Sequence, residues 1–322
     1  MLIPILLFAL GLVLLIKGGD WFVDGACGVA KRFNLPEILI GATVVAIGTT
    51  LPEVMVSSTA AVGGSGAIAY GNSIGSVICN TALISAITIA VMPGVVDRKS
   101  LGLPVAFFFG SALLYCFAAY FMGEFTRIIG VTFLVIFAVY ILISAINAKK
   151  HISDVSDDPD PEEVKLNPLW KDLLLIVIGA ALIAWGANLL VDNGIKIATA
   201  LGVPQTVIAL TFVALGTSLP ELVTAITSLA KGHGNLSLGN VIGANLFNIV
   251  LVSGASVTLS PFAVPAEKTF MGYNTSLLIE LPLMMFVMAL LTVPAIIKGK
   301  LYRWQGIVLL VIYAAFCIFQ FV

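Results

Sequence analysis

Long apolar runs separated by short polar stretches make up almost the whole of this chain. An α-helix needs about 20 apolar residues to cross the hydrocarbon core of a bilayer, and the runs are at least that long. The pattern predicts an all-α membrane protein with ten transmembrane helices. The expected spans are residues 2–28, 38–62, 68–92, 101–120, 126–147, 169–200, 204–230, 236–259, 275–297 and 302–321.

The only strongly polar stretch, residues 151–167, lies between the fifth and sixth predicted spans. Its prolines and acidic residues predict a solvated linker. A calcium-binding regulatory loop is the alternative interpretation. That stretch, however, contains no glycine and does not have the ligand spacing of an EF-hand.

Comparison of the chain with itself shows two similar halves. Glu53 and Glu221 are 168 positions apart, and the same offset relates Asn80 to Asn248. Each half contains five predicted spans, and an odd number places the second half in the membrane upside down. We therefore predict two inverted-topology repeats, an architecture typical of transporters that bind substrate at the bilayer midplane. The expected division is a first five-helix repeat at 1–147, a cytoplasmic acidic linker at 148–168 and a second five-helix repeat at 169–322.

The composition narrows the class of protein. Hydrophobic residues make up 60% of the 322 residues and charged residues only 10%, which excludes a soluble domain of this size. The net charge of −1 gives no indication of nucleic-acid binding, and the sequence has no nucleotide-binding G-x-x-x-x-G-K-[ST] loop. Its four cysteines are scattered without a C-x-x-C pair, so neither a disulfide framework nor a zinc site is expected. The sequence predicts a transport protein and not an enzyme.

Basic residues predict the orientation of the chain, because cytoplasmic loops of membrane proteins carry an excess of Lys and Arg. With the N-terminus outside, the inward-facing segments hold Lys31, Arg32, Arg98, Lys99, Lys149, Lys150, Lys165, Lys171, Lys231, Lys298, Lys300 and Arg303. The outward-facing segments hold only Arg127, Lys196 and Lys268. We expect a multi-pass protein of the plasma (inner) membrane, with both termini outside and the linker in the cytoplasm.

A hexapeptide that ends in glutamate occurs once in each half, as Gly48-Thr49-Thr50-Leu51-Pro52-Glu53 and as Gly216-Thr217-Ser218-Leu219-Pro220-Glu221. Each glutamate lies deep in a predicted span. An ionisable side chain there costs about 2.5–3.5 kcal/mol and is a functional candidate by default. The proline displaces the carbonyl four residues earlier from its helical hydrogen bond. Carboxylates, hydroxyls and freed carbonyls together predict an oxygen-rich cation site.

Neighbouring positions support the same site. Thr49 lies one helical turn before Glu53, as Thr217 does before Glu221, so each pair shares a helix face. The following predicted spans carry stripes of small residues that allow close backbone approach, at Gly71, Gly75, Gly239 and Gly243. These stripes would bring Asn80 and Asn248 against the carboxylates.

Structural interpretations stand beside these functional ones. The glycines and asparagines are also typical of plain helix packing, and the hydroxyls of bonds to their own helix carbonyls. We expect Asp20 and Asp24, which lie near Lys17 in the sequence, to form a structural ion pair.

The ligand types decide between cations. Calcium accepts about six to eight oxygen ligands, and two glutamates supply two negative charges that neutralise one calcium ion. The absence of His and Cys from this set argues against zinc or copper, and magnesium holds its waters too tightly for such a cage. Two monovalent ions would neutralise the same carboxylates. Mutually exclusive occupancy of this kind is what ion exchange requires.

The doubled motifs G-T-[TS]-L-P-E and G-N-x-I-G-[SA]-x-x-x-N resemble those of the sodium/calcium exchanger family of cation/calcium antiporters. The resemblance covers the two alpha-repeats, here residues 41–80 and 209–248, and implies ten helices in two inverted halves. It also implies that sodium enters as calcium leaves, with no cofactor besides the transported ions. Glu53 and Glu221 would be ligands shared by both ions.

Further ligands follow from the same resemblance. Hydroxyl groups would line the sodium positions at Thr49, Thr50, Thr217, Ser218 and Ser76. The backbone carbonyls of Ala46 and Ala214 would also be ligands, and Asn80 and Asn248 would lie beside the central site.

Two residues depart from the family's pattern. Ala244 stands where similar archaeal members have a serine ligand, so we expect one sodium position to be weaker, or to be completed by a carbonyl or water. Asn248 replaces the aspartate of potassium-dependent relatives. This replacement argues against potassium co-transport and leaves two formal negative charges at the centre.

The sequence thus predicts a secondary active antiporter that exchanges sodium for calcium by alternating access at a midplane site. By family analogy, the first helix of each repeat would slide against the rest. The alternatives are a proton/calcium antiporter of the same fold and a non-transporting membrane protein with a cation site. The expected partners are sodium, calcium and the lipid bilayer, without nucleic acid, and the monomer is the functional unit by family analogy.

Overall fold

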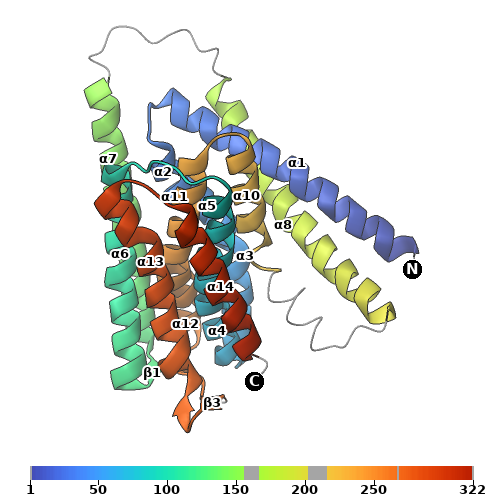
Figure 1. The fold of residues 1–322 in the computed structure, drawn as a ribbon, viewed down its shortest axis with the longest axis vertical. Helices are drawn as coiled ribbons and strands as arrows, with labels where there is room; N and C mark the ends of the chain where they lie inside the picture. Colours follow the sequence, from blue (N-terminus) through green and yellow to red (C-terminus); the bar gives the residue numbers. More distant parts are fainter. Residues whose placement is uncertain (1, 156–166, 202–215, 267, 321–322) are drawn as a thin grey trace.

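The computed structural model describes residues 2–155, 167–201, 216–266 and 268–320, with side chains for all of these except 150–155. Helices form almost all of this part of the chain (Figure 1). Within it, nine helices are long and apolar enough to cross a membrane. The prediction of an all-α membrane protein is therefore confirmed.

The first half contains five apolar spans, and π-helical turns, labelled η, lie within the second and third of them and at the end of the fourth. Its elements are α1 (Leu2–Arg32), α2 (Glu37–Ile40), η1 (Gly41–Val45), α3 (Ala46–Val62), α4 (Gly66–Cys79), η2 (Asn80–Ser85), α5 (Ala86–Val91), α6 (Arg98–Phe117), η3 (Ala118–Met122), β1 (Glu124–Phe125) and α7 (Arg127–Val155).

The second half has a similar succession of helices, but its strands and the η6 turn precede the fourth long helix, whereas η3 and β1 of the first half follow it. Its elements are α8 (Leu169–Ala200), α10 (Leu219–Ala230), α11 (Gly234–Phe247), η5 (Asn248–Val252), α12 (Ser253–Leu259), β2 (Phe262–Ala263), β3 (Thr269–Phe270), β4 (Tyr273–Asn274), η6 (Ser276–Glu280), α13 (Leu281–Lys298) and α14 (Arg303–Gln320). The seventh predicted span, residues 204–230, is represented by α10, a short apolar helix, and its residues 204–215 lie outside the described ranges.

The third and eighth spans, Gly66–Val91 and Gly234–Leu259, are the most deeply buried of the long helices. The glycines of α11 pack against α2 and η1. A Cβ added to Gly243 would lie 2.6 Å from the Cα of Ala42, and one added to Gly239 would collide with the backbone of Ile38. Close backbone approach therefore explains the small-residue stripe on α11.

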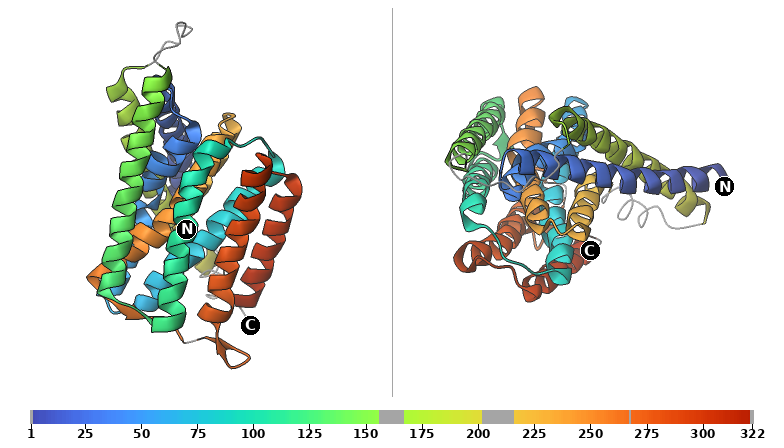
Figure 2. Two further views of the ribbon diagram at one scale, coloured as in Figure 1. Left: turned by 90° about the vertical axis from the view of Figure 1, so that its left-hand side faces the viewer. Right: turned by 90° about the horizontal axis from the view of Figure 1, so that it is seen from above.

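The first helix of each half forms a crossed pair that packs on one side of the bundle and projects beyond it. Figure 2 shows α1 and α8 side by side, extending beyond the rest of the bundle. A Cβ added to Gly11 would lie 2.8 Å from the carbonyl oxygen of Gly186, and one added to Gly18 would lie 2.9 Å from that of Gly179. The repeat offset exchanges these two contacts, so the crossing of α1 and α8 has the symmetry predicted for the halves.

Two short backbone pairings join the halves at opposite ends of the bundle. At the end where α7 ends and α8 begins, here called the linker end, Val95 pairs with Lys300. At the other end, called the hairpin end because it carries the β3–β4 hairpin, Glu124 of β1 pairs with Ala263 of β2 (Figure 1). Val95 and Ala263 are repeat mates. Their partners, Lys300 and Glu124, each lie between the fourth and fifth long helices of their half. The two pairings therefore join corresponding connections at opposite ends of the bundle, as inverted repeats require.

The ion pair expected between Lys17 and the two aspartates is wrong. Lys231, in the turn between α10 and α11, instead approaches Asp24 at 2.7 Å and Asp20 at 3.4 Å, and its ammonium also donates to the backbone carbonyl of Asp20 at 3.0 Å. Because Lys231 is more than 200 positions away in the sequence, local spacing gave no indication of it. These contacts attach α1 to the α10–α11 turn at the linker end.

The tight crossing predicts a position-dependent effect of adding one methyl group. We expect Gly18→Ala to lower stability by about 1–3 kcal/mol, because its Cβ meets backbone atoms of α8 that cannot move aside. Gly110→Ala in α6 is the matched control, since its Cβ would have no atom within 4 Å, and it should be neutral or stabilising. The measurement is the thermal unfolding midpoint of the purified protein in detergent. Equal midpoints for the two variants would contradict the close crossing.

Candidate cation site

The two hexapeptides occupy different positions relative to their helices. Pro52 lies inside α3, so the helix continues through it and the Gly48 carbonyl loses its usual amide partner. Pro220 lies in the first turn of α10, where no helical hydrogen bond is lost. Glu53 is therefore in the middle of a helix, whereas Glu221 is near the beginning of one. Thr217 precedes α10, so the prediction that it shares a helix face with Glu221 is wrong.

Both glutamates are completely buried. Glu53 and Glu221 each have no exposed surface, and their carboxyl groups are near enough to interact electrostatically. The hydroxyl of Thr49 lies beside the Glu221 carboxyl group. The two carboxylates predicted from opposite halves are thus brought together at one place in the described structure.

Two equivalent hydrogen bonds connect the halves beside these carboxylates. Thr49 donates to Oδ1 of Asn240, and Thr217 donates to Oδ1 of Asn72, each at 3.2 Å. The repeat offset turns one bond into the other. Asn72 and Asn240 are functional candidates that the sequence analysis did not select, although their Gly-Asn pairs recur at the repeat offset. Their role was missed because the bonds join different halves.

Many polar atoms around the glutamates have no hydrogen-bond partner among the described residues. The orphaned atoms at sequence-predicted positions are both carboxylate oxygens of Glu53 and of Glu221, the hydroxyls of Thr50 and Ser218, both amide atoms of Asn80, and Oδ1 of Asn248. A buried polar group without a partner costs about 1–3 kcal/mol, and an unpaired charge costs more. So many orphaned oxygens in one place are the expected lining of a site that a cation completes.

Asn80 and Asn248 each begin a π-helical turn, η2 and η5. η2 packs against α10, which carries Glu221, and η5 packs against α3, which carries Glu53. Each asparagine therefore begins a turn of one half that packs against the glutamate-bearing helix of the other. The sequence did not predict these turns, which interrupt the regular hydrogen bonds of a helix and occur often at functional sites.

The remaining predicted ligands have separate outcomes. Ser76 is buried on α4, one turn before Asn80, and Ala46 is buried at the start of α3, where its carbonyl accepts from Thr49 at 3.4 Å. Ala214 lies outside the described residues. Ala244 supplies no side-chain oxygen, but its carbonyl accepts from Nδ2 of Asn248 at 3.0 Å.

One asymmetry separates the two halves near the site. Nδ2 of Asn72 donates to Ser57 at 2.8 Å, whereas Nδ2 of Asn240 is buried without a partner in the described part of the chain. The repeat mate of Ser57 is Ala225, which has no acceptor. The second half is therefore less completely hydrogen-bonded than the first at this position.

A small gap separates the site from the α1–α8 pair. Its lining includes Phe22 of α1, Ala180 of α8, and Thr49 and Pro52 of α3. The ring of Phe22 also lies against Gly48, where an added Cβ would be 3.0 Å away. The α1–α8 pair thus covers one side of the site.

Comparison with known proteins gives consistent matches over nearly the full length. The sequence profile of the family described as "Sodium/calcium exchanger protein" matches residues 3–146 and 171–322. An uncharacterised membrane protein of Methanocaldococcus jannaschii is 36% identical, with 95% of this chain and 94% of that protein aligned. The sodium/calcium exchanger MaX1 of Methanosarcina acetivorans is 30% identical, with 98% of each chain aligned.

A solved structure shows the same fold. The sodium-calcium exchanger NCX_Mj, soaked with 2.5 mM Na+ and 10 mM Sr2+, superposes with a TM-score of 0.80 at 32% identity. The alignment covers 98% of this chain and 97% of that one.

The asymmetry between Ser57 and Ala225 generates a paired prediction. Ala225→Ser should raise stability by about 0.5–1.5 kcal/mol, because it gives Nδ2 of Asn240 the acceptor that it lacks. Ser57→Ala should lower stability by a similar amount, because it removes the nearer acceptor of Asn72 Nδ2 at 2.8 Å and leaves only the Glu53 carbonyl at 3.4 Å. Thermal unfolding midpoints in detergent measure both effects. A lower midpoint for Ala225→Ser together with an unchanged one for Ser57→Ala would contradict the assignment.

Proposed function

The chain belongs to the sodium/calcium exchanger family, and we propose that it is a secondary active antiporter that exchanges sodium for calcium across the membrane. The observation that carries the proposal is the pair of buried carboxylates, Glu53 and Glu221, without hydrogen-bond partners in the described residues. Neither alternative considered from the sequence is favoured by the relatives, which include named sodium/calcium exchangers.

Charge balance supports exchange at this pair. Burying one ion without compensation costs several kcal/mol, so two adjacent carboxylates need about two positive charges near them. One calcium ion supplies both charges, and so do two sodium ions. Occupancy by one kind of ion excludes the other, which couples the release of calcium to the entry of sodium.

The ligand atoms support calcium and sodium over softer metals. We assign Glu53 and Glu221 as ligands common to both ions, and the amide oxygens of Asn80 and Asn248 as neighbours of the central position. Carboxylate, amide, hydroxyl and carbonyl oxygens are hard ligands, which suit calcium. We assign the sodium positions to the hydroxyls of Thr49, Thr50, Thr217, Ser218 and Ser76, with the carbonyls of Ala46 and Ala214.

The two departures from the family's pattern fit one local arrangement. Nδ2 of Asn248 donates to the Ala244 carbonyl, which leaves Oδ1 of Asn248 free to face a cation. Asn248 therefore adds an oxygen without a charge, and the site keeps two formal negative charges. This count supports exchange without potassium. The absent hydroxyl at Ala244 weakens the sodium position nearest to it.

Alternating access requires that the site opens to one side at a time. We assign the movement to the α1–α8 pair, which covers the site through Phe22 and Ala180. The two helices of this pair cross with backbone atoms close together at their glycines. Since the glycine contacts hold α1 and α8 together, the two helices move as one body against the other spans.

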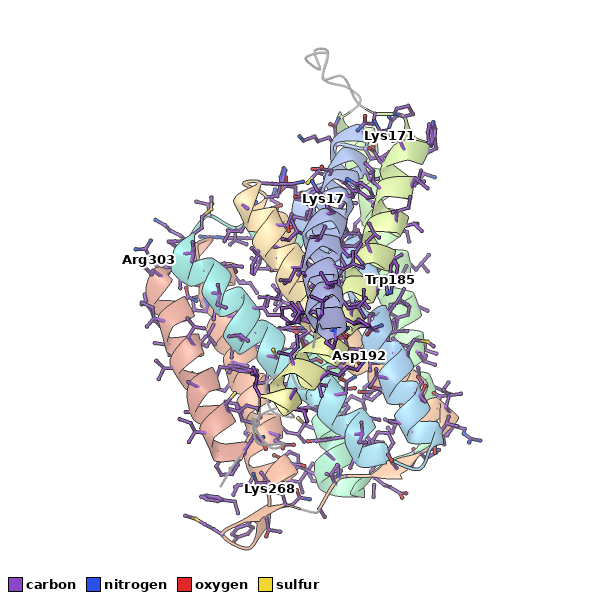
Figure 3. All side chains as sticks on the ribbon, turned by 90° about the vertical axis from the view of Figure 1, so that its right-hand side faces the viewer. Lys17, Lys171, Trp185, Asp192, Lys268 and Arg303 are labelled. Carbon is purple, nitrogen blue, oxygen red and sulfur yellow. The ribbon has the colours of Figure 1, made fainter. Side chains whose placement is uncertain are left out.

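Charge distribution supports an orientation in the plasma membrane. Ten described basic residues lie at the linker end, namely Lys31, Arg32, Arg98, Lys99, Lys149, Lys171, Lys231, Lys298, Lys300 and Arg303. Figure 3 shows Lys171 and Arg303 toward this end and Lys268 at the hairpin end. By the positive-inside rule, the linker end is cytoplasmic and both termini are outside. One chain contributes both carboxylates, so we take the monomer as the transporting unit.

Glu53→Gln and Glu221→Gln should each abolish sodium-driven calcium uptake into proteoliposomes. Removing one charge from the buried site costs about 3–5 kcal/mol, or more than about 100-fold in calcium affinity. Glu124→Gln, at the hairpin end, is the exposed control and should leave uptake unchanged. Uptake that follows a pH gradient and ignores the sodium gradient would select the proton antiporter instead. Calcium binding without flux would select a non-transporting protein.

Orientation is tested by labelling intact cells with a membrane-impermeant maleimide. Met271→Cys, in the exposed turn of the β3–β4 hairpin, should react from outside beyond the labelling of the four native cysteines in the unmodified protein. Lys99→Cys, at the start of α6, should react only after the membrane is permeabilised. The opposite pattern would reverse the assigned orientation.

A further inference from the structure

A second group of ligand side chains lies away from the glutamates, at the linker end. Cys27 of α1, Glu37 of α2 and His233 from the α10–α11 turn each offer one ligand atom, and these atoms lie within 4.8 Å of one another. This is the one such group of three among the residues that the structure describes. It joins three elements that are far apart in the sequence, so the cysteine pattern alone gave no indication of a metal site.

The backbone holds two of these side chains at the ends of helices. Glu37 is the first residue of α2, directly after Pro36, and His233 directly precedes α11. The backbone amide of His233 donates to the Ser228 carbonyl at 2.7 Å, which closes the α10–α11 turn. Nδ1 of His233 lies 2.6 Å from Oε1 of Glu37. The carboxylate and the imidazole are thus positioned before any metal binds.

Burial leaves the group open on one side only. Cys27 is 6% exposed, while the side chains of His233 and Glu37 are 22% and 31% exposed. The sulfur therefore forms the inner wall, and the partly exposed imidazole and carboxylate side chains lie toward the aqueous end of the bundle. This arrangement admits an ion from solution and leaves its fourth position to water, as in three-ligand zinc sites.

The ligand chemistry differs from that of the midplane site. A thiolate is a soft ligand and an imidazole is intermediate, and together they select zinc-class ions and reject calcium and sodium. Thiolate and carboxylate carry two negative charges, which one divalent ion neutralises. Metal binding at this place would release the thiol proton of Cys27 to solvent.

The observed separations are compatible with tetrahedral coordination. Zinc bonds of about 2.0 Å to nitrogen or oxygen and about 2.3 Å to sulfur place neighbouring ligand atoms roughly 3.3–3.6 Å apart. The distance between Nδ1 of His233 and Oε1 of Glu37, now 2.6 Å, therefore has to lengthen by less than about 1 Å when the metal replaces their hydrogen bond. Rotation of side chains at the open face supplies this movement.

A simpler explanation of the group is a hydrogen-bonded Glu37–His233 pair that happens to lie beside a buried cysteine. The corresponding positions in the other half show whether the fold itself requires these residue types. The repeat mates of Cys27, Glu37 and His233 are Ile195, Gln205 and Ser65. None of them is a cysteine, carboxylate or histidine, so the fold does not require these three residue types at these places. Of these two sets of repeat mates, the one with all three ligand types lies at the cytoplasmic end of the proposed orientation.

We propose that Cys27, Glu37 and His233 bind a divalent transition metal of the zinc class, and that the bound metal inhibits transport. The ion would cross-link α1 to α2 and to the α10–α11 turn, beside the contact between Lys231 and Asp24. It would therefore hold the α1–α8 pair against the other spans. The inhibitory part rests on the proposed function, whereas the binding part does not.

Cobalt binding to the purified full-length protein tests the site directly. We expect one equivalent of Co2+ to give a thiolate-to-cobalt charge-transfer band and tetrahedral visible bands, both displaced by Zn2+. Cys27→Ser should abolish the charge-transfer band. His233→Gln and Glu37→Gln should weaken Zn2+ affinity by at least about 10- to 100-fold, the loss typical of removing an outer-shell partner alone. Cys317→Ser, on α14, is the matched control and should bind like the unmodified protein.

Calcium binding and the thermal unfolding midpoint identify any variant that has lost its fold, and the spectra are compared only among folded variants. A charge-transfer band that survives Cys27→Ser would overturn the site. So would the absence of any band in the unmodified protein, or equal losses in Cys27→Ser and Cys317→Ser.

Flux in proteoliposomes tests the inhibitory part. Micromolar Zn2+ on the linker side should reduce sodium-driven calcium flux of the unmodified protein, and Cys27→Ser should remove this sensitivity while it keeps its flux. Zinc inhibition equal in both proteins would place the inhibiting ion elsewhere and overturn this part. A chain that shows the cobalt spectrum but no sodium-driven flux would refute the proposed function and leave the metal site standing.

Discussion

Two carboxylates that no group in the described protein neutralises govern the rest of the structure. Glu53 and Glu221 are fully buried, and their carboxylate oxygens have no hydrogen-bond partner among the residues that the structure describes. Isolated, such a pair would oppose folding by several kcal/mol, so a cation or protons must complete it. The surrounding hydroxyl and amide groups that have no partner among the described residues need a ligand for the same reason. The folded chain therefore needs positive charge beside this pair, and in the proposed function either calcium or sodium supplies it.

Contacts between the halves position these carboxylates. The threonine before each glutamate bonds to an asparagine of the opposite half, and each asparagine-led π-turn packs on the opposite glutamate's helix. Neither half could build the site alone. The repeat offset also exchanges the two glycine contacts at the α1–α8 crossing. The site and the helix pair that covers it therefore follow the same two-fold relation between the halves.

The repeat, the spans and the glutamates were predictable because they depend on local pattern and on a constant offset. Contacts that join distant segments were not. Lys231 replaced Lys17 as the partner of Asp24, Asn72 and Asn240 bonded across the halves, and Cys27 met two residues from other elements. The π-helical turns at Asn80 and Asn248 also escaped prediction, since no residue pattern distinguishes them from regular helix. Ala214 and the start of its span remain predictions.

The two strand pairings have a consequence for how such chains vary. Val96 and Leu301 donate their backbone amides to Gly299 and Gly94, and the β1–β2 ladder is likewise formed by main-chain atoms. Main-chain bonds survive replacement of most side chains, because every residue except proline carries the same donor and acceptor. Loops on both surfaces can therefore acquire new charges or binding motifs during evolution while the frame beneath them stays fastened.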